Sequence, residues 1–290
     1  MAECLLKSIL FFSLISIGVG AYGQSQTITA TGSGVFTVPA GVTTITVEVW
    51  GAGGAGRGNV GGGGGGGAYS SSIISSPLSA SYSYFIGTGG ISGNVNGGDT
   101  SFGTLLLAKG GLGSTSSTGG AGGQASSGLG TNKTNGFNGV NGGGNSGGNG
   151  GSSPNGGAGG TGGGNRAFGA AGSSPGGGGG GSGNQNTTVS AGGDGKIIIT
   201  WTCSNTLTSA ASTVNQLLCK DINISPITYA IGGATGANVT GLPSGVTYSY
   251  IAGNLIISGA PIVSGTFNYT VYPTGSCTSS IINGTITVSP

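Results

Sequence analysis

The chain has 290 residues, 72 of them glycine, and only 4% of its residues are charged. A glycine share of roughly a quarter, against a usual value near 7%, argues against an enzyme and favours a surface, adhesive or structural role. The net charge is only +2 and histidine is absent, so we expect neither a nucleic-acid partner nor a Ser-His-Asp triad or histidine zinc site. The carboxylates Glu48, Asp99, Asp194 and Asp221 are scattered, so no catalytic residue, metal site or cofactor is predicted.

Residues 1–23 have the features of a secretory signal peptide. Lys7 lies in a short polar start, an apolar run follows at 8–19, and small residues close the segment. The apolar run is interrupted and shorter than the roughly 20 residues that a membrane span needs. We therefore expect a mature chain that begins near Gln24, keeps no membrane span, and is secreted to the extracellular space or cell surface.

Residues 24–201 are predicted to form a β-sandwich that carries a long glycine-rich insertion. The early strands are expected at 34–39 and 42–50, where β-branched and polar residues alternate with the period of a half-buried strand. Further strands are expected at 68–74, 81–86, 101–108 and 196–201. The last of these has the same β-branched character as the early strands, so we expect it to return and pair with them.

The insertion, residues 110–193, consists almost entirely of Gly, Ser, Asn, Thr and Ala. A helix is excluded because each glycine costs about 1 kcal/mol relative to alanine, and a conventional core is excluded by the lack of large apolar side chains. One hypothesis is a disordered low-complexity loop. The other is a polyglycine II bundle, since glycine recurs at every third residue in several runs and turn signals at 153–156 and 173–176 suit repeated bends. In so glycine-rich a chain, chance spacing leaves both hypotheses open.

After a linker at 202–218, residues 219–290 are predicted to form a small Ig-like β-sandwich. Its strands are expected at 222–231, 246–251, 254–258, 265–271 and 280–288. Cys219 and Cys277 bracket this domain, and a disulfide between them would contribute about 4 kcal/mol by the chain-entropy model. Cys203 is left over, and is free, replaces Cys219 as the partner of Cys277, or pairs outside the chain.

Two parts of the sequence look familiar. Residues 36–42, 47–54 and 195–201 resemble the glycine-rich domain of bacterial surface proteins and phage tail-fibre proteins, over nearly all of 33–201. Residues 207–211, 239–246, 257–261 and 265–271 look like Ig-like modules repeated in large secreted proteins of Bacteroidetes. These resemblances imply display at a cell surface, with adhesion as the usual role. Such secreted proteins commonly carry a C-terminal sorting domain, so the end at Pro290 suggests a truncated product or an excerpt.

The leading functional hypothesis is a secreted, non-catalytic adhesin or extracellular matrix protein whose glycine-rich surface binds surface carbohydrate or protein. Candidate ligand-binding side chains are Phe137, Arg166 and Phe168, with Asn132 and Asn165 nearby. The alternative for both phenylalanines is packing on the edge of the bundle or against the sandwich. Rival functions are ice binding and a self-assembling extracellular filament subunit, the latter through exposed strand edges or Cys203.

Overall fold

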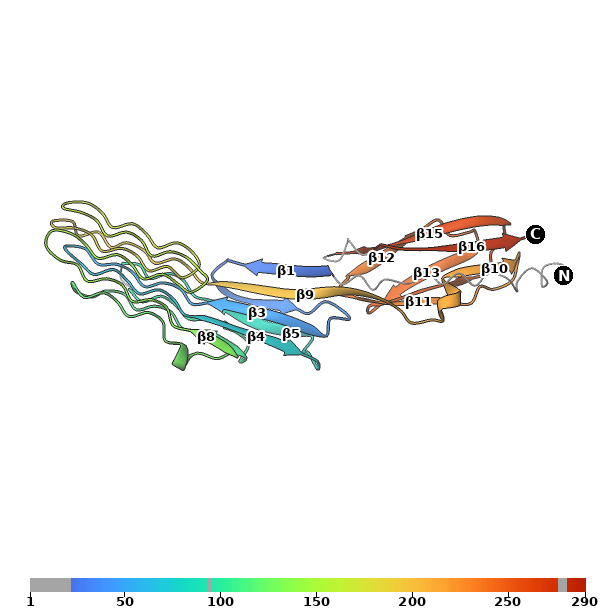
Figure 1. Ribbon diagram of the computed structural model, residues 1–290, viewed down its shortest axis with the longest axis horizontal. Coiled ribbons are helices and arrows are strands. Elements are labelled where there is room, and N and C mark those ends of the chain that lie inside the picture. Colours follow the sequence, from blue (N-terminus) through green and yellow to red (C-terminus); the bar gives the residue numbers. More distant parts are fainter. Residues whose placement is uncertain (1–21, 93–94, 276–280) are drawn as a thin grey trace. The chain divides into compact units, whose positions relative to one another are not determined.

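The computed structural model describes residues 22–92, 95–275 and 281–290 (Figure 1). Its described residues form β-strands and no α-helix, with two short 3-10 turns at η2 (Ala125–Ser127) and η3 (Ala211–Thr213). The predicted all-β class is confirmed. The chain divides into two compact units. We call Ser25–Val38 with Thr44–Thr200 the glycine-rich unit, and Pro39–Thr43 with Trp201–Pro290 the C-terminal unit.

One sheet of the glycine-rich unit is built around β3 (Thr44–Trp50), which pairs antiparallel with β4 (Tyr69–Ser75). Strand β8 (Asn132–Thr134) follows β4 in the sheet, and β9 (Lys196–Leu207) lies on the other side of β3. Strand β1 (Tyr22–Ile28) pairs with β9. The predicted return of the 196–201 strand to the early strands is therefore confirmed.

The second sheet of this unit has the order β2 (Gly32–Thr37), β5 (Ser81–Ile86), β6 (Thr100–Phe102), β7 (Leu106–Ala108). Strand β3 contacts β6 and β7, and β4 contacts β7, so the two sheets pack against each other. The alternation predicted from the sequence fills the space between them, because Ile45, Val47 and Val49 are fully buried. Phe102 completes this core and packs on Tyr82 with ring centroids 5.0 Å apart.

Between its strands, the glycine-rich unit runs as extended segments that belong to no sheet. Figure 1 shows these segments lying beside one another at one end of the unit. They comprise 51–57, 61–68, 87–91, 95–99, 109–114, 119–124, 135–142, 147–153, 157–164, 167–173, 177–183 and 186–195. The glycine body is thus larger than the predicted insertion at 110–193, because the segments that follow β3 and β5 and precede β4 and β6 also belong to it.

In the C-terminal unit, one sheet has the order β13 (Val246–Ile251), β14 (Asn254–Gly259), β11 (Ile227–Gly232), β9. The second sheet has the order β10 (Asn215–Cys219), β16 (Ile282–Ser289), β15 (Gly265–Thr274), β12 (Gly236–Thr240). Strand β10 pairs parallel with β16, whereas β15 pairs antiparallel with both of its neighbours. The residues expected as a linker, 202–218, lie in β9, η3 and β10 and in the short connections between them.

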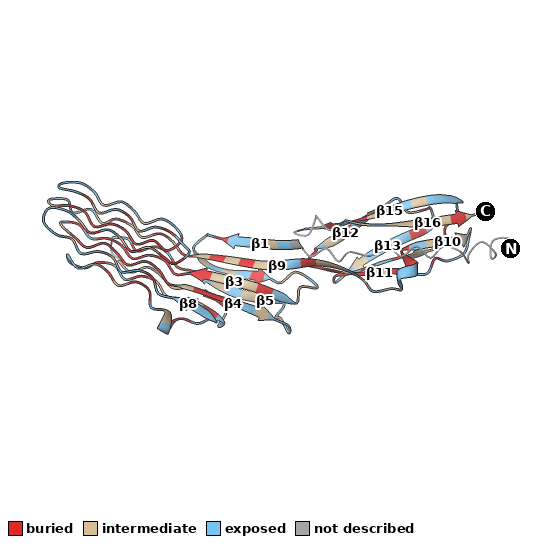
Figure 2. Ribbon diagram, viewed as in Figure 1, coloured by how far each residue is buried: buried red, intermediate tan, exposed pale blue. Residues whose placement is uncertain are grey.

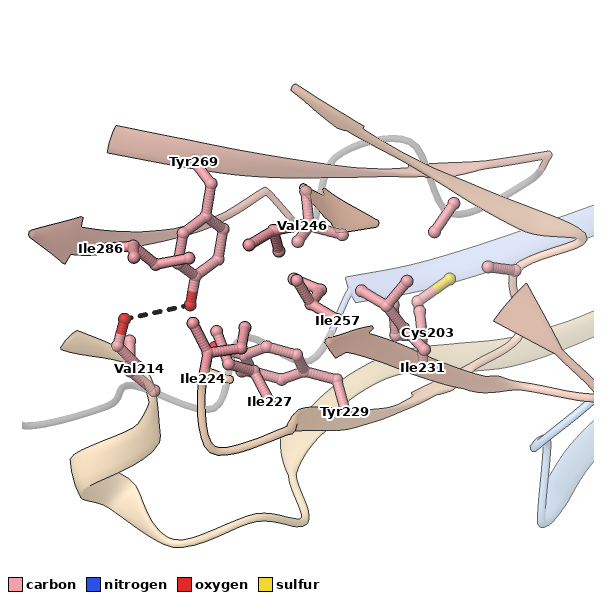
Figure 3. Packing of buried hydrophobic residues seen from close by; sticks show 14 of the residues in the cluster. Cys203, Val214, Ile224, Ile227, Tyr229, Ile231, Val246, Ile257, Tyr269 and Ile286 are labelled. Atoms are coloured by element: carbon pink, nitrogen blue, oxygen red, sulfur yellow. Dashed lines mark hydrogen bonds between the residues drawn. The ribbon is translucent and has the colours of Figure 1, made fainter. Parts of the chain in front are cut away.

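The core of the C-terminal unit lies between these two sheets (Figure 3). Ile257 from β14 and Ile286 from β16 are fully buried, and so is Tyr269 from β15. The Tyr269 hydroxyl donates a hydrogen bond to the backbone oxygen of Val214, 3.1 Å away (Figure 3). This bond satisfies the one polar group that the tyrosine brings into an apolar interior.

Cys203 is buried in the same core, and Cys219 ends β10. Neither Cys203 nor Cys219 is a free thiol, so the alternative that left Cys203 free is wrong. The predicted pairing of Cys219 with Cys277 falls on Cys277, which lies outside the described residues.

Candidate functional site

The innermost glycine segment, 61–67, has backbone N–H groups that donate to three different segments in turn. The acceptors of Gly61, Gly64 and Gly67 lie in 176–182, those of Gly62 and Gly65 lie in 112–116, and those of Gly63 and Gly66 lie in 137–140, with N···O distances of 2.8 to 3.3 Å. Residues three positions apart therefore donate to the same neighbouring segment. Successive peptide groups therefore point to different neighbours around the segment, so no flat ladder of the kind found in a sheet forms.

Only glycine fits along this segment. Every residue of 61–67 is buried, and a Cβ built at any of these positions would come within 3.0 Å of a backbone oxygen of an adjacent segment. The same crowding occurs along 177–183, where Gly178 would meet Gly64 and Gly181 would meet Gly61. Unbroken glycine runs in the sequence thus mark the segments that have neighbours on all sides.

Segments at the periphery follow a different pattern, which 135–142 illustrates with repeated Asn-Gly-x triplets. Its glycines face the body, and its asparagines accept hydrogen bonds from backbone N–H groups of the adjacent 119–125 segment. The acceptor Oδ1 atoms of Asn135, Asn138 and Asn141 lie 2.7, 2.9 and 2.8 Å from the amide nitrogens of Ala125, Gly122 and Gly119. The third position, Phe137 or Val140, faces solvent with 62% or 55% exposure.

Two carboxylates for which the sequence suggested no role accept hydrogen bonds from backbone amides in the same way. Asp194 accepts a hydrogen bond from the Gly89 amide at 2.8 Å, and Asp99 accepts one from the Gly110 amide at 2.9 Å and pairs with Lys109. These side chains replace backbone carbonyls where a segment has no neighbour. Within the described ranges, no group of three or more acidic, histidine or cysteine side chains could hold a metal ion.

The turns at the far ends of the segments form the most distinctive surface of the glycine-rich unit. Strand β3 ends at Trp50 and β4 begins at Tyr69, and two extended segments connect them. The turn at 58–60 joins these two segments at the end that is far from the strands (Figure 1). Turns at 143–146, 164–166 and 184–186 end other segments at the same side. Together with Arg57 and Thr187, we call these turns the distal turn cluster.

Hydrogen bonds tie this cluster together across large sequence separations. The Asn59 amide donates to the Asn186 oxygen, and the Asn184 amide donates to the Asn145 oxygen at 3.0 Å. The Arg166 amide donates to the Asn184 oxygen at 3.1 Å, and the Asn186 side-chain amide reaches the Arg166 oxygen at 3.5 Å. The tips of separate segments are therefore held as one surface, and Figure 2 marks the segment ends as largely exposed.

Several residues of the cluster have left-handed backbone conformations. The φ angles are 57° at Asn59, 60° at Arg166 and 57° at Gln185. Asparagine adopts this region more readily than most residues, whereas arginine and glutamine do so only when the surrounding structure holds them there. Val60 has a φ of 54°, which is still less favourable for a β-branched residue, so the surrounding structure holds these turns rigidly.

The predicted site residues are only partly brought together. Arg166 and Asn165 lie in the distal turn cluster, and Phe168 follows two residues later with 67% exposure. Phe137 is exposed in an extended segment, not at a turn, and Asn132 lies in β8. Sequence reasoning missed Arg57, Asn59 and the 184–186 turn, although the Asn-Gln-Asn run after a stretch of glycines was a readable turn signal.

One shallow depression lies elsewhere on the unit, beside the turn between β4 and β5. Its volume is about 560 Å³, and it is lined by Ile74, Pro77, Ser79, Ser81, Tyr82, Ser83, Gly103, Thr104 and Leu105. The lining contains no charged side chain and no candidate nucleophile–base pair, so it offers no catalytic arrangement.

A family model described as a glycine-rich domain matches residues 28–202. The chain belongs to this family. The resemblance of the first part of the sequence to a glycine-rich domain is thereby confirmed, and the match covers β2 to β8, the first half of β9 and all of the extended segments. A comparison with curated proteins finds no match. Among the described residues, no helix has the length and apolar character needed to cross a membrane.

Proposed function

We propose that the chain is a secreted, non-catalytic adhesin or extracellular matrix protein that presents the distal turn cluster to a carbohydrate or protein on a cell surface. In this proposal, the glycine segments are polyglycine II-type helices that pack side by side into a bundle. The β-sheets anchor the near ends of the helices, and the bundle holds their far ends in place.

The three-residue repeat of backbone hydrogen bonds supports the polyglycine II part of the proposal. A left-handed helix with three residues per turn directs successive N–H groups to different neighbours, and close approach requires glycine at the inward positions. The bonds of 61–67 and the asparagine caps of 135–142 both follow this period. Such a body gains rigidity from its backbone and leaves the side chains at its surface and turns available for binding.

The observation that carries the adhesin proposal is the joining of the turns into one exposed surface. A binding site needs side chains held in fixed relative positions, and turns on a rigid scaffold commonly supply them. Here the Asn59, Asn184 and Arg166 amides all bond to other turns of the cluster. We expect recognition through amide and guanidinium groups, without turnover.

Adsorption of the purified secreted chain to immobilised glycans and to whole cells tests this proposal. The informative variant is Asn165→Gly with Gln185→Gly, which removes two exposed side chains of the cluster and relaxes the left-handed backbone at 185. The matched control is Asn155→Gly, because Asn155 has a φ of 50° in a turn at the opposite end of the segments. Equal adsorption by the double variant and the control, or no adsorption by the unmodified chain, would contradict the proposal.

Ice binding is a second candidate, favoured by the outward face of the sheet that contains β15 and β16. The Thr270 hydroxyl donates to Asn283 Oδ1 at 2.9 Å, and the Thr285 hydroxyl donates to Asn268 Oδ1 at 3.0 Å. These cross-strand bonds fix uncharged groups in rows about 4.8 Å apart, an arrangement that could order water. A thermal-hysteresis measurement tests this candidate, and normal ice growth in the presence of the protein would remove it.

A further inference from the structure

We propose that the distal turn cluster binds glycans that carry phosphate or carboxylate groups, through Arg57 and Arg166. This inference rests on the adhesin function proposed above and adds the chemical class of the ligand. The few charged residues of the chain are unevenly distributed. Both arginines of the chain lie in the cluster, although only 4% of all residues are charged.

Arg57 and Arg166 contact the same part of the chain through their backbones. The Arg57 oxygen accepts a hydrogen bond from the Ser182 amide at 2.8 Å, just before the 184–186 turn, and the Arg166 amide donates to the Asn184 oxygen within it. Both arginines are exposed. In the part of the chain that the structure describes, neither guanidinium has a hydrogen-bond or ion-pair partner, so both remain available to a ligand.

Carboxylates of the glycine-rich unit do not neutralise this end. Asp99 and Asp194 lie at the strand ends of their segments, where each already caps a backbone amide, and Glu48 accepts a hydrogen bond from Tyr69 within the sheet. Asp194 is eight residues beyond Asn186, which is about 25 Å at 3.1 Å per residue. That separation is roughly three Debye lengths at physiological ionic strength, so the field of the arginines is not cancelled.

The groups around the arginines favour a hydrated anionic ligand over an apolar one. The turns contribute side-chain amides from Asn59, Asn184 and Gln185 and a hydroxyl from Thr187, while the Asn186 side chain is already bonded to the Arg166 oxygen and the Thr188 amide. These groups suit sugar hydroxyls, while a planar guanidinium matches a phosphate or carboxylate with two parallel hydrogen bonds. Two cations are too few to bind a nucleic-acid backbone tightly, which leaves an anionic glycan as the fitting partner.

Binding of the purified chain to matched glycan pairs tests the inference. Each pair consists of a neutral oligosaccharide and its phosphorylated or uronic-acid counterpart, so that the two sources of negative charge are scored separately. We expect preference for the anionic member, with affinity falling about tenfold for Arg57→Gln and again for Arg166→Gln, since a charge-assisted hydrogen bond has been removed each time. Raising the salt concentration should weaken binding by the unmodified chain more than by the double variant.

Lys220→Gln is the matched control, because it removes one positive charge from the C-terminal unit and leaves the cluster intact. Arg57→Lys and Arg166→Lys retain the charge and test whether the planar guanidinium matters. Binding to neutral and anionic glycans with equal affinity, insensitive to salt and to both arginine substitutions, would overturn the inference while leaving an adhesin. Equal losses in the arginine variants and Lys220→Gln would also overturn it, because the effect would then follow net charge alone.

Discussion

Replacing Gly64 with alanine tests whether the glycine body is as tightly constrained as its contacts indicate. A Cβ at residue 64 would come within 3.0 Å of the Gly54 backbone oxygen, which belongs to a segment and not to a flexible side chain. Relief would require the segment to move. Such movement would strain the bond from the Gly64 amide to the Gly179 oxygen and the bond from the Gly151 amide to the Gly64 oxygen, each 2.8 Å long.

The close contact of the added Cβ and the strain on the two hydrogen bonds both lower the stability of the segment. Overpacking a well-packed interior typically costs 1–3 kcal/mol, and each weakened hydrogen bond adds up to about 1 kcal/mol. We therefore expect Gly64→Ala to reduce the free energy of local opening by about 3 kcal/mol. Amide exchange along 61–67 should then be about a hundredfold faster than in the unmodified chain, because 1.4 kcal/mol corresponds to a factor of ten.

Gly164→Ala is the matched control, since nothing lies within 4 Å of a Cβ built there and its backbone is not left-handed. This substitution should be neutral, or stabilising by up to about 1 kcal/mol, because alanine restricts the unfolded chain. Hydrogen exchange followed by mass spectrometry compares the two variants. If Gly64→Ala exchanged no faster than Gly164→Ala, the three-dimensional packing inferred for the inner segments would be refuted.

Three further predictions concern single side chains. Asn138→Ala should remove the cap on the Gly122 amide and cost about 1 kcal/mol, which faster exchange at Gly122 would reveal, whereas Asn165→Ala should leave that exchange unchanged. Tyr269→Phe should destabilise the C-terminal unit by about 1 kcal/mol in denaturant unfolding, because the buried Val214 oxygen loses one of its two donors and keeps only the Thr285 amide, 3.2 Å away; an unchanged midpoint would show that the Thr285 amide alone satisfies this oxygen. Burial raises the pKa of Tyr269 above its ordinary value of 10.0, so its contribution to stability should be complete below pH 10 and decline as pH rises further, and the Phe variant should lose this component of the alkaline decline.

The strands with one buried face could be read from the sequence. In β3, isoleucine and valine alternate with polar residues, and that period of two alone specifies the buried face. In contrast, residues 215–218 of β10 were expected to lie in a linker, because this segment shows no strong alternation. Its position depends on parallel pairing with β16, a contact between residues some 70 positions apart that local patterns do not encode.

The spacing of glycine by three could be read from the sequence, whereas the boundaries and the side-chain caps of the glycine segments could not. Glycine at every third residue was recognised near 136–142, but the same spacing of Asn135, Asn138 and Asn141 was not linked to capping, because the receiving amides lie on another segment. The distal turn cluster was also only partly foreseen. Arg57 joins Arg166 through the Ser182 and Asn184 contacts, and no spacing along the chain reveals that proximity.

The interior of the glycine segments buries peptide groups and almost no hydrocarbon, and this composition governs how stability varies with temperature. Exposing apolar surface raises the heat capacity on unfolding, whereas exposing polar surface lowers it. The glycine-rich unit should therefore have a heat-capacity change per residue well below the usual value of about 12–15 cal/mol/K. A small heat-capacity change flattens the curve of unfolding free energy against temperature. The distal turn cluster that these segments hold should therefore stay folded at low temperature, where proteins stabilised mainly by a hydrophobic core lose stability.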